Sequence, residues 1–281
     1  GITNDTLERA LKDVTMPDES VVEQDRKQPE STVTFERYMK RVVNQGRIRK
    51  AQGLAAEHRS LLKEVSEAYG IPSSVIVALW GIESNFGEIT GNYAIIDSLA
   101  TLAYEGRRAK FFEEELTNAL RMIQNDHISP EEMTGSWAGA MGQCQFMPSS
   151  YLKFAQDFNR DGKKDIWDST PDVFASIANY LEKSGWDGSK PWGVKATLPE
   201  GFDTGKTGRT NKQSLDAWKS QGVKFRAGLP SGQYAIVLPD DGDADTAYLV
   251  STNYDVIMKW NRSLFFATAV GTLSDAITRG E

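Results

Sequence analysis

Apolar residues recur along the first part of the chain with the spacing of an α-helix. Between residues 34 and 69 they fall about 3.6 positions apart, at Leu54, Leu61, Leu62, Val65 and Ala68. Gly70 and Pro72 then signal the end of one helix and the start of the next. The residues before this region are mostly polar and contain Pro17 and Pro29, which predicts a short helix followed by an extended segment.

The segment from Val75 to Ile82 is apolar on every side. A helix with this pattern is buried all round in a globular protein, because it has no polar face to turn toward water. It is far shorter than the roughly 20 apolar residues of a membrane span, and no apolar run in the sequence approaches that length. We therefore expect a core helix here.

Other helices are predicted from apolar spacing and from residues that favour helix ends. Asp97 or Ser98 is expected to cap a helix that ends near Tyr104. Three more helices are predicted at 112–123, 170–181 and 263–277.

A small β-rich region is predicted in the last third of the chain. Residues 191–245 are rich in Gly, Asp, Lys, Thr and Pro, and strand-like runs appear at Tyr234–Leu238, Thr246–Ser251 and Tyr254–Met258. Together with the helices, these runs predict an α+β fold that is mainly α, with a helical body and a small β lobe.

Composition narrows the classes of function. The 281 residues are 40% hydrophobic, which suffices for a core and excludes global disorder. The net charge of −7 and the lack of a basic tract argue against nucleic acid as a partner. Cys144 is the single cysteine, which excludes an intrachain disulfide and a cysteine zinc site. A catalytic triad would need His58 or His127 and is disfavoured. The chain starts with neither a signal segment nor Met, so we expect a mature or trimmed chain.

An acidic loop at residues 157–168 matches the spacing of an EF-hand calcium loop, with Gly162 at the sharp turn. The expected ligands are five side-chain oxygens and one backbone carbonyl, from Asp157, Asn159, Asp161, Asp165, Asp168 and Lys163. Asp168 is shorter than the Glu usual at the last position, so we expect one structural Ca²⁺ of moderate affinity. The alternative is a solvated turn.

Glu83 directly follows the apolar helix. Its neighbours Leu79, Trp80, Ile82 and Phe86 would remove part of its water and disfavour the anion, as a general acid requires. The alternative is a helix-terminal glutamate that turns toward water.

A second candidate segment runs from Gly135 to Pro148 and combines small residues with Gln, Met and aromatic residues. Its glycines would let the backbone approach a ligand closely. Ser136 and Gln145 offer neutral hydrogen-bonding groups, and aromatic faces suit sugar rings. A tightly packed junction between helix and loop would have the same pattern.

Three blocks together resemble the signature of the lysozyme-like lytic transglycosylases: Glu83–Gly87, Ser136–Pro148 and Ala178–Tyr180. Further blocks are similar to the B-type family of lytic murein transglycosylases: Asp97–Leu102, the pair Arg107 and Arg108, Gln145–Tyr151 and the inserted EF-hand-like loop. The resemblance extends from about residue 34 to the C-terminus. Several separate blocks in one order make it specific.

The resemblance implies an enzyme with a lysozyme-like catalytic core that acts on peptidoglycan. It would cleave the β-1,4 bond between N-acetylmuramic acid (MurNAc) and N-acetylglucosamine (GlcNAc) without water and leave a 1,6-anhydro-MurNAc end. Glu83 would be the single general acid and base, whereas other glycosidases use two carboxylates. The substrate's own 2-acetamido group would stabilise the reacting carbon, and catalysis would need no cofactor.

The resemblance also implies roles for residues around Glu83. Ser136 and Gln145 would hydrogen-bond Glu83 or the N-acetyl group. Further contacts with sugars or with the acidic stem peptide would come from Tyr180, Asn261, Tyr38, Arg107 and Arg108. Cys144, Trp260 and Phe266 depart from the family pattern, and we expect Cys144 to be a small buried residue.

The predicted organisation has three parts. An N-terminal helical region, 1–80, packs with the C-terminal helix 262–281, a catalytic core follows at 81–190, and a β lobe follows at 191–261. The implied compartment is the periplasm, and an outer-membrane anchor in a longer precursor stays open. The implied partners are peptidoglycan glycan strands and stem peptides, together with other cell-wall enzymes.

Three other functions stay open. A hydrolytic muramidase would keep Glu83 but use water in place of the substrate hydroxyl. A non-catalytic peptidoglycan-binding protein would have no use for Glu83, Ser136 and Gln145 together. A calcium-regulated interaction module would explain the acidic loop but not the rest of the chain.

Overall fold

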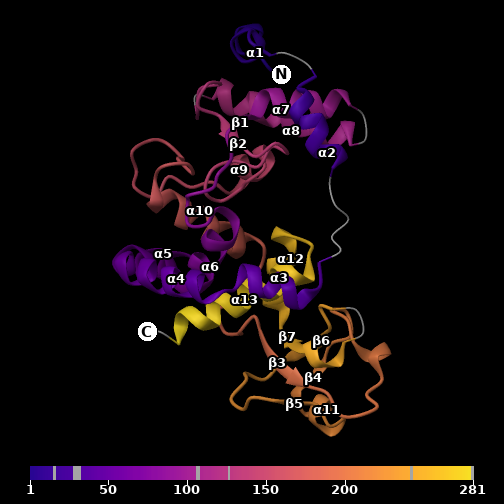
Figure 1. Ribbon diagram of the computed structural model, residues 1–281. Coiled ribbons are helices and arrows are strands. Elements are labelled where there is room, and N and C mark those ends of the chain that lie inside the picture. The colour runs from indigo at the N-terminus through magenta and orange to yellow at the C-terminus, as the bar shows by residue number, and fades with distance from the viewer. Residues whose placement is uncertain (15–16, 28–32, 106–107, 126, 241–242, 280–281) are drawn as a thin grey trace. The chain divides into compact units, whose positions relative to one another are not determined.

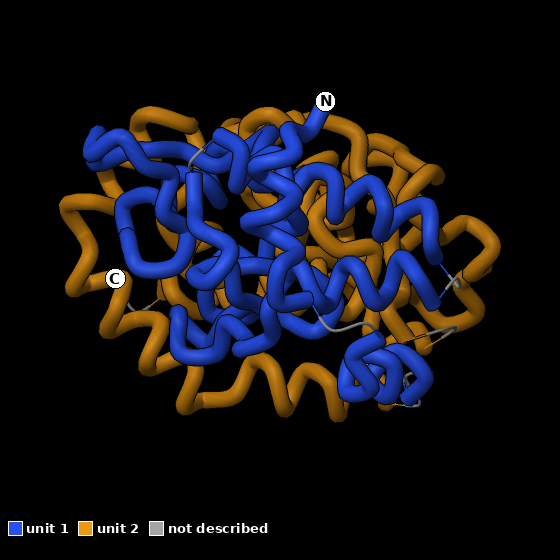
Figure 2. Tube along the Cα trace, turned by 90° about the horizontal axis from the view of Figure 1, so that it is seen from above, with its two compact units in different colours: residues 1–32, 79–180 blue, residues 33–78, 181–281 orange. Residues whose placement is uncertain are grey.

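The computed structural model describes residues 1–14, 17–27, 33–105, 108–125, 127–240 and 243–279 (Figure 1). The chain divides into two compact units, which Figure 2 colours separately. Unit 1 contains residues 1–32 and 79–180, and unit 2 contains residues 33–78 and 181–281. Two of the three boundaries fall inside helices, α6 (Ser73–Ser84) and α10 (Thr170–Lys183). The predicted domains 1–80, 81–190 and 191–261 are a different division and stay a prediction.

Unit 1 is built mainly from helices, with one short pair of strands. Its complete elements are α1 (Asn4–Leu11), α2 (Glu19–Arg26), β1 (Tyr93–Ala94), α7 (Ile95–Tyr104), α8 (Ala109–Gln124), β2 (Thr134–Gly135) and α9 (Pro148–Phe154). Helix α8 organises this unit, because it packs against α1, α7 and α9. Strands β1 and β2 pair antiparallel, with Tyr93 opposite Gly135.

Helix α6 is the core helix that the apolar pattern predicts. Each residue from Val75 to Trp80 exposes at most 4% of its surface. A helix with no polar face gains the most from burial when neighbours cover it on every side.

The described residues among the first thirty form two helices, where the sequence predicts one followed by an extended segment. The prediction is wrong for 19–26, which form α2. Its N-cap Asp18 accepts hydrogen bonds from the backbone N–H groups of Ser20 and Val21, and the helix packs against α7. Val21 is the buried residue of this helix, which is too little apolar signal for a visible period.

Helix α7 begins before its predicted cap. It starts at Ile95 after Ala94, which has no side-chain acceptor, so the prediction that Asp97 or Ser98 caps it is wrong. The N–H of Ile95 instead donates to the carbonyl of Met133 at 3.1 Å. Asp97 lies in the first helical turn, where a negative charge is favourable.

In unit 2 the helical pattern between residues 34 and 69 is three helices, α3 (Phe35–Val42), α4 (Gln45–Glu57) and α5 (Arg59–Tyr69). Side chains of Thr34 and Asn44 cap the first two. Helix α5 ends at Gly70 with a φ of 69°, a left-handed conformation that glycine adopts without a steric cost. The C-terminal helix α13 (Leu264–Thr278) packs against α3 and α4.

The small β lobe is a five-stranded antiparallel sheet in unit 2. Its strands are β3 (Gly193–Thr197), β4 (Gln213–Ser214), β5 (Lys224–Phe225), β6 (Gln233–Val237) and β7 (Tyr248–Val250), in the order β4-β6-β7-β3-β5. Two 3-10 turns, Thr204–Lys206 and Ala244–Thr246, connect them. Trp218 of α11 (Leu215–Ser220) is fully buried in the lobe's core and donates its Nε1–H to the carbonyl of Tyr234 at 2.8 Å.

The run from Tyr254 to Met258 is helical, so the prediction of a strand there is wrong. It lies in α12 (Thr252–Trp260), whose N-cap Ser251 accepts a hydrogen bond from the N–H of Asn253. Most of this helix is buried. A short apolar run looks the same in a buried strand and in a buried helix, so the sequence pattern could not separate them. With this correction, the predicted class, mainly α with a small β lobe, is confirmed.

Among the described residues, no single helix is long and apolar enough to cross a membrane. Helices α5 and α6 reach that length and composition only as a pair, and they are bent by 109° at the break between them.

Candidate functional site

Glu83 lies in the last turn of α6 and is half-buried. Its chain neighbour Ser84 is fully buried, and Trp80, one turn earlier, is 4% exposed. The ring of Trp80 makes edge contacts with Phe86 and Phe174, at centroid distances of 5.4 and 5.1 Å. Glu83 therefore extends from the C-terminal turn of a helix, and the aromatic contacts of Trp80 hold that turn in place.

The turn after Glu83 is unusual, because three consecutive residues have left-handed backbone. The φ angles are 52° at Asn85, 63° at Phe86 and 84° at Gly87. Such a conformation is uncommon for a bulky residue and costs on the order of 1–3 kcal/mol, so the surroundings must impose it. Ser84 helps to hold the turn: its Oγ accepts the N–H of Gly87 at 3.0 Å and donates to the carbonyl of Trp80 at 3.2 Å.

The glycine-rich segment from Gly135 is a tightly packed junction. A Cβ at Gly135 would lie 2.2 Å from the carbonyl oxygen of Ala140, and one at Gly91 would lie 2.1 Å from the carbonyl oxygen of Gly135. These glycines are therefore required for backbone to approach backbone. Ser136 belongs to the same turn, and its Oγ accepts the N–H of Ala140 at 3.0 Å.

Gln145 is half-buried and has a left-handed backbone, with a φ of 51°. Its Nε2 donates to the carbonyls of Thr90 at 3.0 Å and of Gly142 at 2.9 Å. The side chain thus ties the segment after Glu83 to the glycine-rich segment. Its predicted role toward the substrate, and that of Ser136, stay predictions.

Gln143 is a residue that the sequence analysis passed over. Its Oε1 accepts the indole N–H of Trp80 at 2.6 Å, and its Nε2 donates to the carbonyl of Trp167 at 2.6 Å. A Cβ at Gly87 would lie 2.4 Å from Oε1, so the amide fills the space that this glycine leaves. The sequence places Gln143 two positions from Gln145 but carries no signal for this arrangement.

Tyr180 and Arg108 occupy different surroundings in unit 1. Tyr180, on α10, is half-buried. The centroid of its ring lies 4.5 Å from that of Phe154 and 5.9 Å from that of Phe146. Arg108 is exposed and places its guanidinium 4.6 Å from the Phe111 ring. Arg107 lies outside the described residues.

Tyr38 and Asn261 belong to unit 2. The Tyr38 ring lies 5.6 Å from the Phe265 ring, with the Arg41 guanidinium 5.9 Å from its centroid. Asn261 is exposed at the end of α12, and its Oδ1 accepts the N–H of Ser263 at 3.0 Å. Their proposed contacts with substrate stay predictions.

Cys144 is fully buried, as the sequence predicts. Its Sγ lies 3.6 Å from the carbonyl oxygen of Val173, to which it donates. Burial raises the pKa of the thiol well above its usual range, and the negative charges of Glu83 and Asp172 add to this. The thiol is therefore protonated and unsuited to act as a nucleophile.

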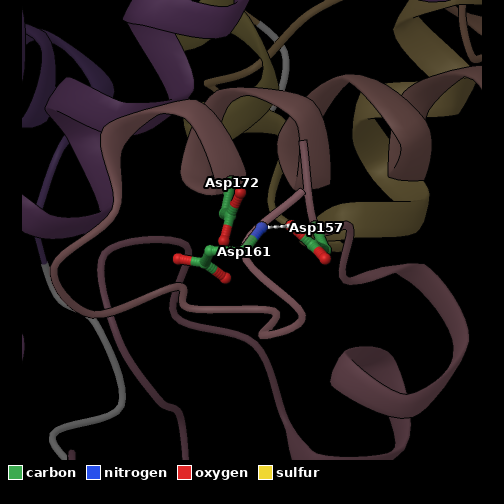
Figure 3. A group of neighbouring side chains, drawn as sticks. All are labelled: Asp157, Asp161 and Asp172. Atoms are coloured by element: carbon green, nitrogen blue, oxygen red, sulfur yellow. Dashed lines mark hydrogen bonds between the residues drawn. The ribbon is translucent and has the colours of Figure 1, made fainter. Parts of the chain in front are cut away.

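The acidic loop gathers carboxylates at the start of α10. Oxygens of Asp157, Asp161 and Asp172 all lie within 4.8 Å of one another (Figure 3). The N–H of Asp161 donates to Asp157 at 3.1 Å, and the N–H of Lys163 donates to Asp161 at 2.8 Å. Both backbone bonds shape the loop around its own side chains, and the bond from the Lys163 N–H lowers the pKa of Asp161.

Asp172 is a further residue that the sequence analysis missed. It is fully buried in the first turn of α10 and accepts backbone N–H groups of Phe158 at 2.8 Å and Asp165 at 2.9 Å. Burial raises its pKa, against the effect of these hydrogen bonds. An acidic residue in a first helical turn is a common feature, so its sequence position did not mark it as part of the loop.

The donor set fits a hard divalent cation, because three carboxylates converge and such ions prefer oxygen ligands. Other predicted ligands behave differently. Asp165 turns its Oδ1 to the backbone N–H groups of Trp167 and Asp168 at 2.8 and 2.9 Å, and Asp168 is exposed. The ligand set of the EF-hand pattern therefore stays a prediction.

A family model described as the transglycosylase SLT domain matches residues 1–275. The chain is 33% identical over 248 residues to the membrane-bound lytic murein transglycosylase B of Escherichia coli strain K12. This match covers 86% of the chain and 66% of that relative, just under two thirds of its length.

Solved structures agree with this match. SltB3 of Pseudomonas aeruginosa, in complex with NAG-anhNAM-pentapeptide, has 42% identity and a TM-score of 0.94, and the match covers 100% of this chain and 76% of SltB3. Slt35 of Escherichia coli in complex with calcium has 28% identity and a TM-score of 0.82, and the match covers 98% of this chain and 87% of Slt35.

Proposed function

This chain belongs to the transglycosylase SLT family, as a lytic transglycosylase of B type, and on that premise we propose that it cleaves peptidoglycan without water. Two relatives support the substrate. One is named a murein transglycosylase, and SltB3 was solved with a GlcNAc–anhydroMurNAc pentapeptide. The fold also agrees with structures of this family over the whole described chain.

We propose Glu83 as the single acid and base. As an acid it would protonate the oxygen that leaves with GlcNAc while the MurNAc C1–O bond breaks. As a carboxylate it would then remove the proton of the MurNAc C6 hydroxyl, whose oxygen forms the new bond to C1. The proton that Glu83 gives is thus replaced, and the product is a 1,6-anhydro-MurNAc end.

The observation that carries this proposal is the rigid placement of Glu83. The residue lies in the last turn of a buried helix. The left-handed turn from Asn85 to Gly87 follows this helix and is held by the hydrogen bond from the Gly87 N–H to Ser84. Strained backbone of this kind clusters at functional sites, where it keeps a reacting group oriented.

Other residues are proposed to contact the substrate. Sugar would be bound by Ser136, Gln145 and Tyr180 in unit 1, and by Tyr38 and Asn261 in unit 2. Arg107 and Arg108 would meet stem peptides.

We further propose that the acidic loop binds one structural Ca²⁺ and that catalysis needs no cofactor. The convergent carboxylates and the calcium complex of Slt35 support the cation. The name of the Escherichia coli relative supports a location in the cell envelope, and we propose the periplasm. Glycan strands, stem peptides and other cell-wall enzymes are the proposed partners.

A digest of purified peptidoglycan tests the reaction. Wild type and Glu83→Gln are compared by mass spectrometry. Glu105→Gln is the matched control, because Glu105 is an exposed glutamate whose carboxylate pairs with Arg26 at 3.4 Å. We expect anhydromuropeptides from wild type and control, and a loss of at least about 10²–10⁴-fold in rate for Glu83→Gln at unchanged melting temperature.

Two outcomes would contradict the proposal. Reducing muropeptides, which are heavier by one water, would identify a hydrolytic muramidase. No product from a folded wild type would favour a non-catalytic peptidoglycan-binding protein.

A further inference from the structure

Gln143 makes hydrogen bonds to two separate parts of unit 1. On one side, its Oε1 accepts the indole N–H of Trp80, three residues before Glu83 on α6, at 2.6 Å. On the other side, its Nε2 donates to the carbonyl of Trp167, at the end of the acidic loop, at 2.6 Å. An indole N–H can only donate and a carbonyl can only accept, so the amide has a single orientation. The oxygen and the nitrogen of the Gln143 amide therefore each have a fixed hydrogen-bond partner.

The backbone around Gln143 makes the contact with the loop still closer. The N–H of Gln143 donates to the carbonyl of Ile166 at 2.8 Å. A Cβ at Gly142 would lie 2.5 Å from the same carbonyl oxygen. The end of the acidic loop thus packs directly on this segment and cannot move without displacing it.

The contact with the turn after Glu83 is equally close. The space beside Gly87 is filled by the amide of Gln143, because a Cβ there would lie 2.4 Å from Oε1. Gly87 is the last of the three left-handed residues that follow Ser84. One half-buried side chain therefore contacts the helix before Glu83, the turn after it and the loop.

We propose that Gln143 is a positioning residue that couples cation binding in the loop 157–168 to the orientation of Glu83. This inference rests on the proposed function for its effect on catalysis and on the proposed cation site for its trigger. A cation that draws Asp157, Asp161 and Asp172 together fixes the loop. Gln143 carries this order to Trp80 and Gly87, and so to the two ends of the segment that holds Glu83.

The test follows the indole N–H signals by ¹H–¹⁵N NMR during a Ca²⁺ titration from chelated protein. The chain has 7 tryptophans, and Trp80→Phe and Trp167→Phe assign the two that matter. In wild type we expect both signals to shift with one midpoint. In Gln143→Met, which keeps the volume but removes both side-chain bonds, we expect Trp167 to shift and Trp80 to stay constant.

Two further variants make the result specific. Gln143→Asn keeps the amide on a shorter side chain that cannot span both partners, so it replaces Gln143→Met if that variant does not fold. Gln221→Met in unit 2 is the matched control, because Gln221 is also half-buried and donates to Gln213 at 2.8 Å and to Ala217 at 3.0 Å. We expect Gln221→Met to behave as wild type in the titration.

Kinetics on peptidoglycan provide the second readout. For wild type we expect kcat to be higher with Ca²⁺ than with chelator. For Gln143→Met we expect kcat to fall on the order of 10–100-fold and to become independent of Ca²⁺. We expect KM to stay unchanged. A purely structural role would lower the melting temperature and leave the kcat of the folded enzyme unchanged.

The outcomes separate the two proposals. The coupling is overturned if Trp80 ignores Ca²⁺ in wild type, if Trp80 follows Ca²⁺ equally in Gln143→Met, or if Trp167 itself does not respond. If Trp80 responds as expected while wild type yields no product from peptidoglycan, the proposed function fails and the structural coupling stands.

Discussion

The segments before and after α10 differ in the side chains that hydrogen-bond their backbone groups. Each is an irregular stretch whose backbone groups need partners. Before the helix, the loop 157–168 uses carboxylates, chiefly Asp172, which accepts N–H groups at 2.8 and 2.9 Å. After the helix, the stretch 187–193 uses chiefly a neutral amide, beside the carboxylate of Asp187, which accepts the N–H of Ser189 at 3.0 Å. Fully buried Asn253 accepts the N–H of Asp187 at 2.8 Å and donates to the carbonyls of Asp187 and Lys190 at 2.8 and 2.7 Å.

The difference shows how the choice of partner decides what a loop responds to. A buried amide satisfies donors and acceptors without net charge, so its contribution is insensitive to pH and cations. Clustered carboxylates satisfy only donors and repel one another, so their contribution depends on protonation and on a bound cation. The first segment is therefore suited to respond to its surroundings, and the second is suited to hold the β lobe.

The largest expected effect is on the neutral side of this comparison. Asn253→Ala removes three hydrogen bonds and leaves buried backbone groups without partners, so we expect the free energy of unfolding to fall by about 3–5 kcal/mol. Chemical denaturation with Ca²⁺ and with chelator measures it. The loss should be the same in both conditions, and Asn211→Ala, at an exposed bond to Thr207, should cost far less. A loss of stability in Asn253→Ala that depends on Ca²⁺ would contradict the difference between the two segments.

The next largest expected effect is that of Ca²⁺ on the free energy of unfolding, and it should depend only on the loop 157–168. At about 100 times its Kd, Ca²⁺ should raise the free energy of unfolding by about 2.7 kcal/mol. Asp157→Ala with Asp161→Ala should abolish this gain, and Asp216→Ala, at a carboxylate that is 96% exposed in unit 2, should keep it. An unchanged melting temperature for wild type would mean that the loop is only a turn.

The smallest expected effect is a pH dependence of opposite sign in the two segments. Burial raises the pKa of Asp172 above 3.8, so without cation its contribution is present at low pH and lost as pH rises through the folded value. Hydrogen bonds from Ser189 and Lys190 lower the pKa of Asp187 to about 2, so its contribution is present above 3.8 and lost as pH falls.

Melting temperatures of chelated wild type, Asp172→Asn and Asp187→Asn at about pH 6 and about pH 3 check the signs. Asp172→Asn should be most destabilising at the lower pH, and Asp187→Asn at the higher. The same sign for both variants would show that the two segments do not differ in electrostatics.

Much of this protein is determined by local sequence. The core helix α6 follows from a run without polar residues, and the end of α5 follows from Gly70. The family follows from several short blocks in one order. The closeness of Asp157 and Asp161 follows from their spacing within the acidic loop. These features depend on residues within a few positions of one another, so a period or a motif records them.

Only tertiary structure decided the rest. Residues Tyr254–Met258 form a helix because their surroundings bury it, although the same pattern suits a strand. Asp172 joins Asp157 and Asp161 because the chain turns back at the start of α10. Gln143 bonds to Trp80, which is 63 positions away, and to Trp167, which is 24 positions away. Such hydrogen bonds form only after packing brings their partners together, and one sequence carries no periodic trace of them.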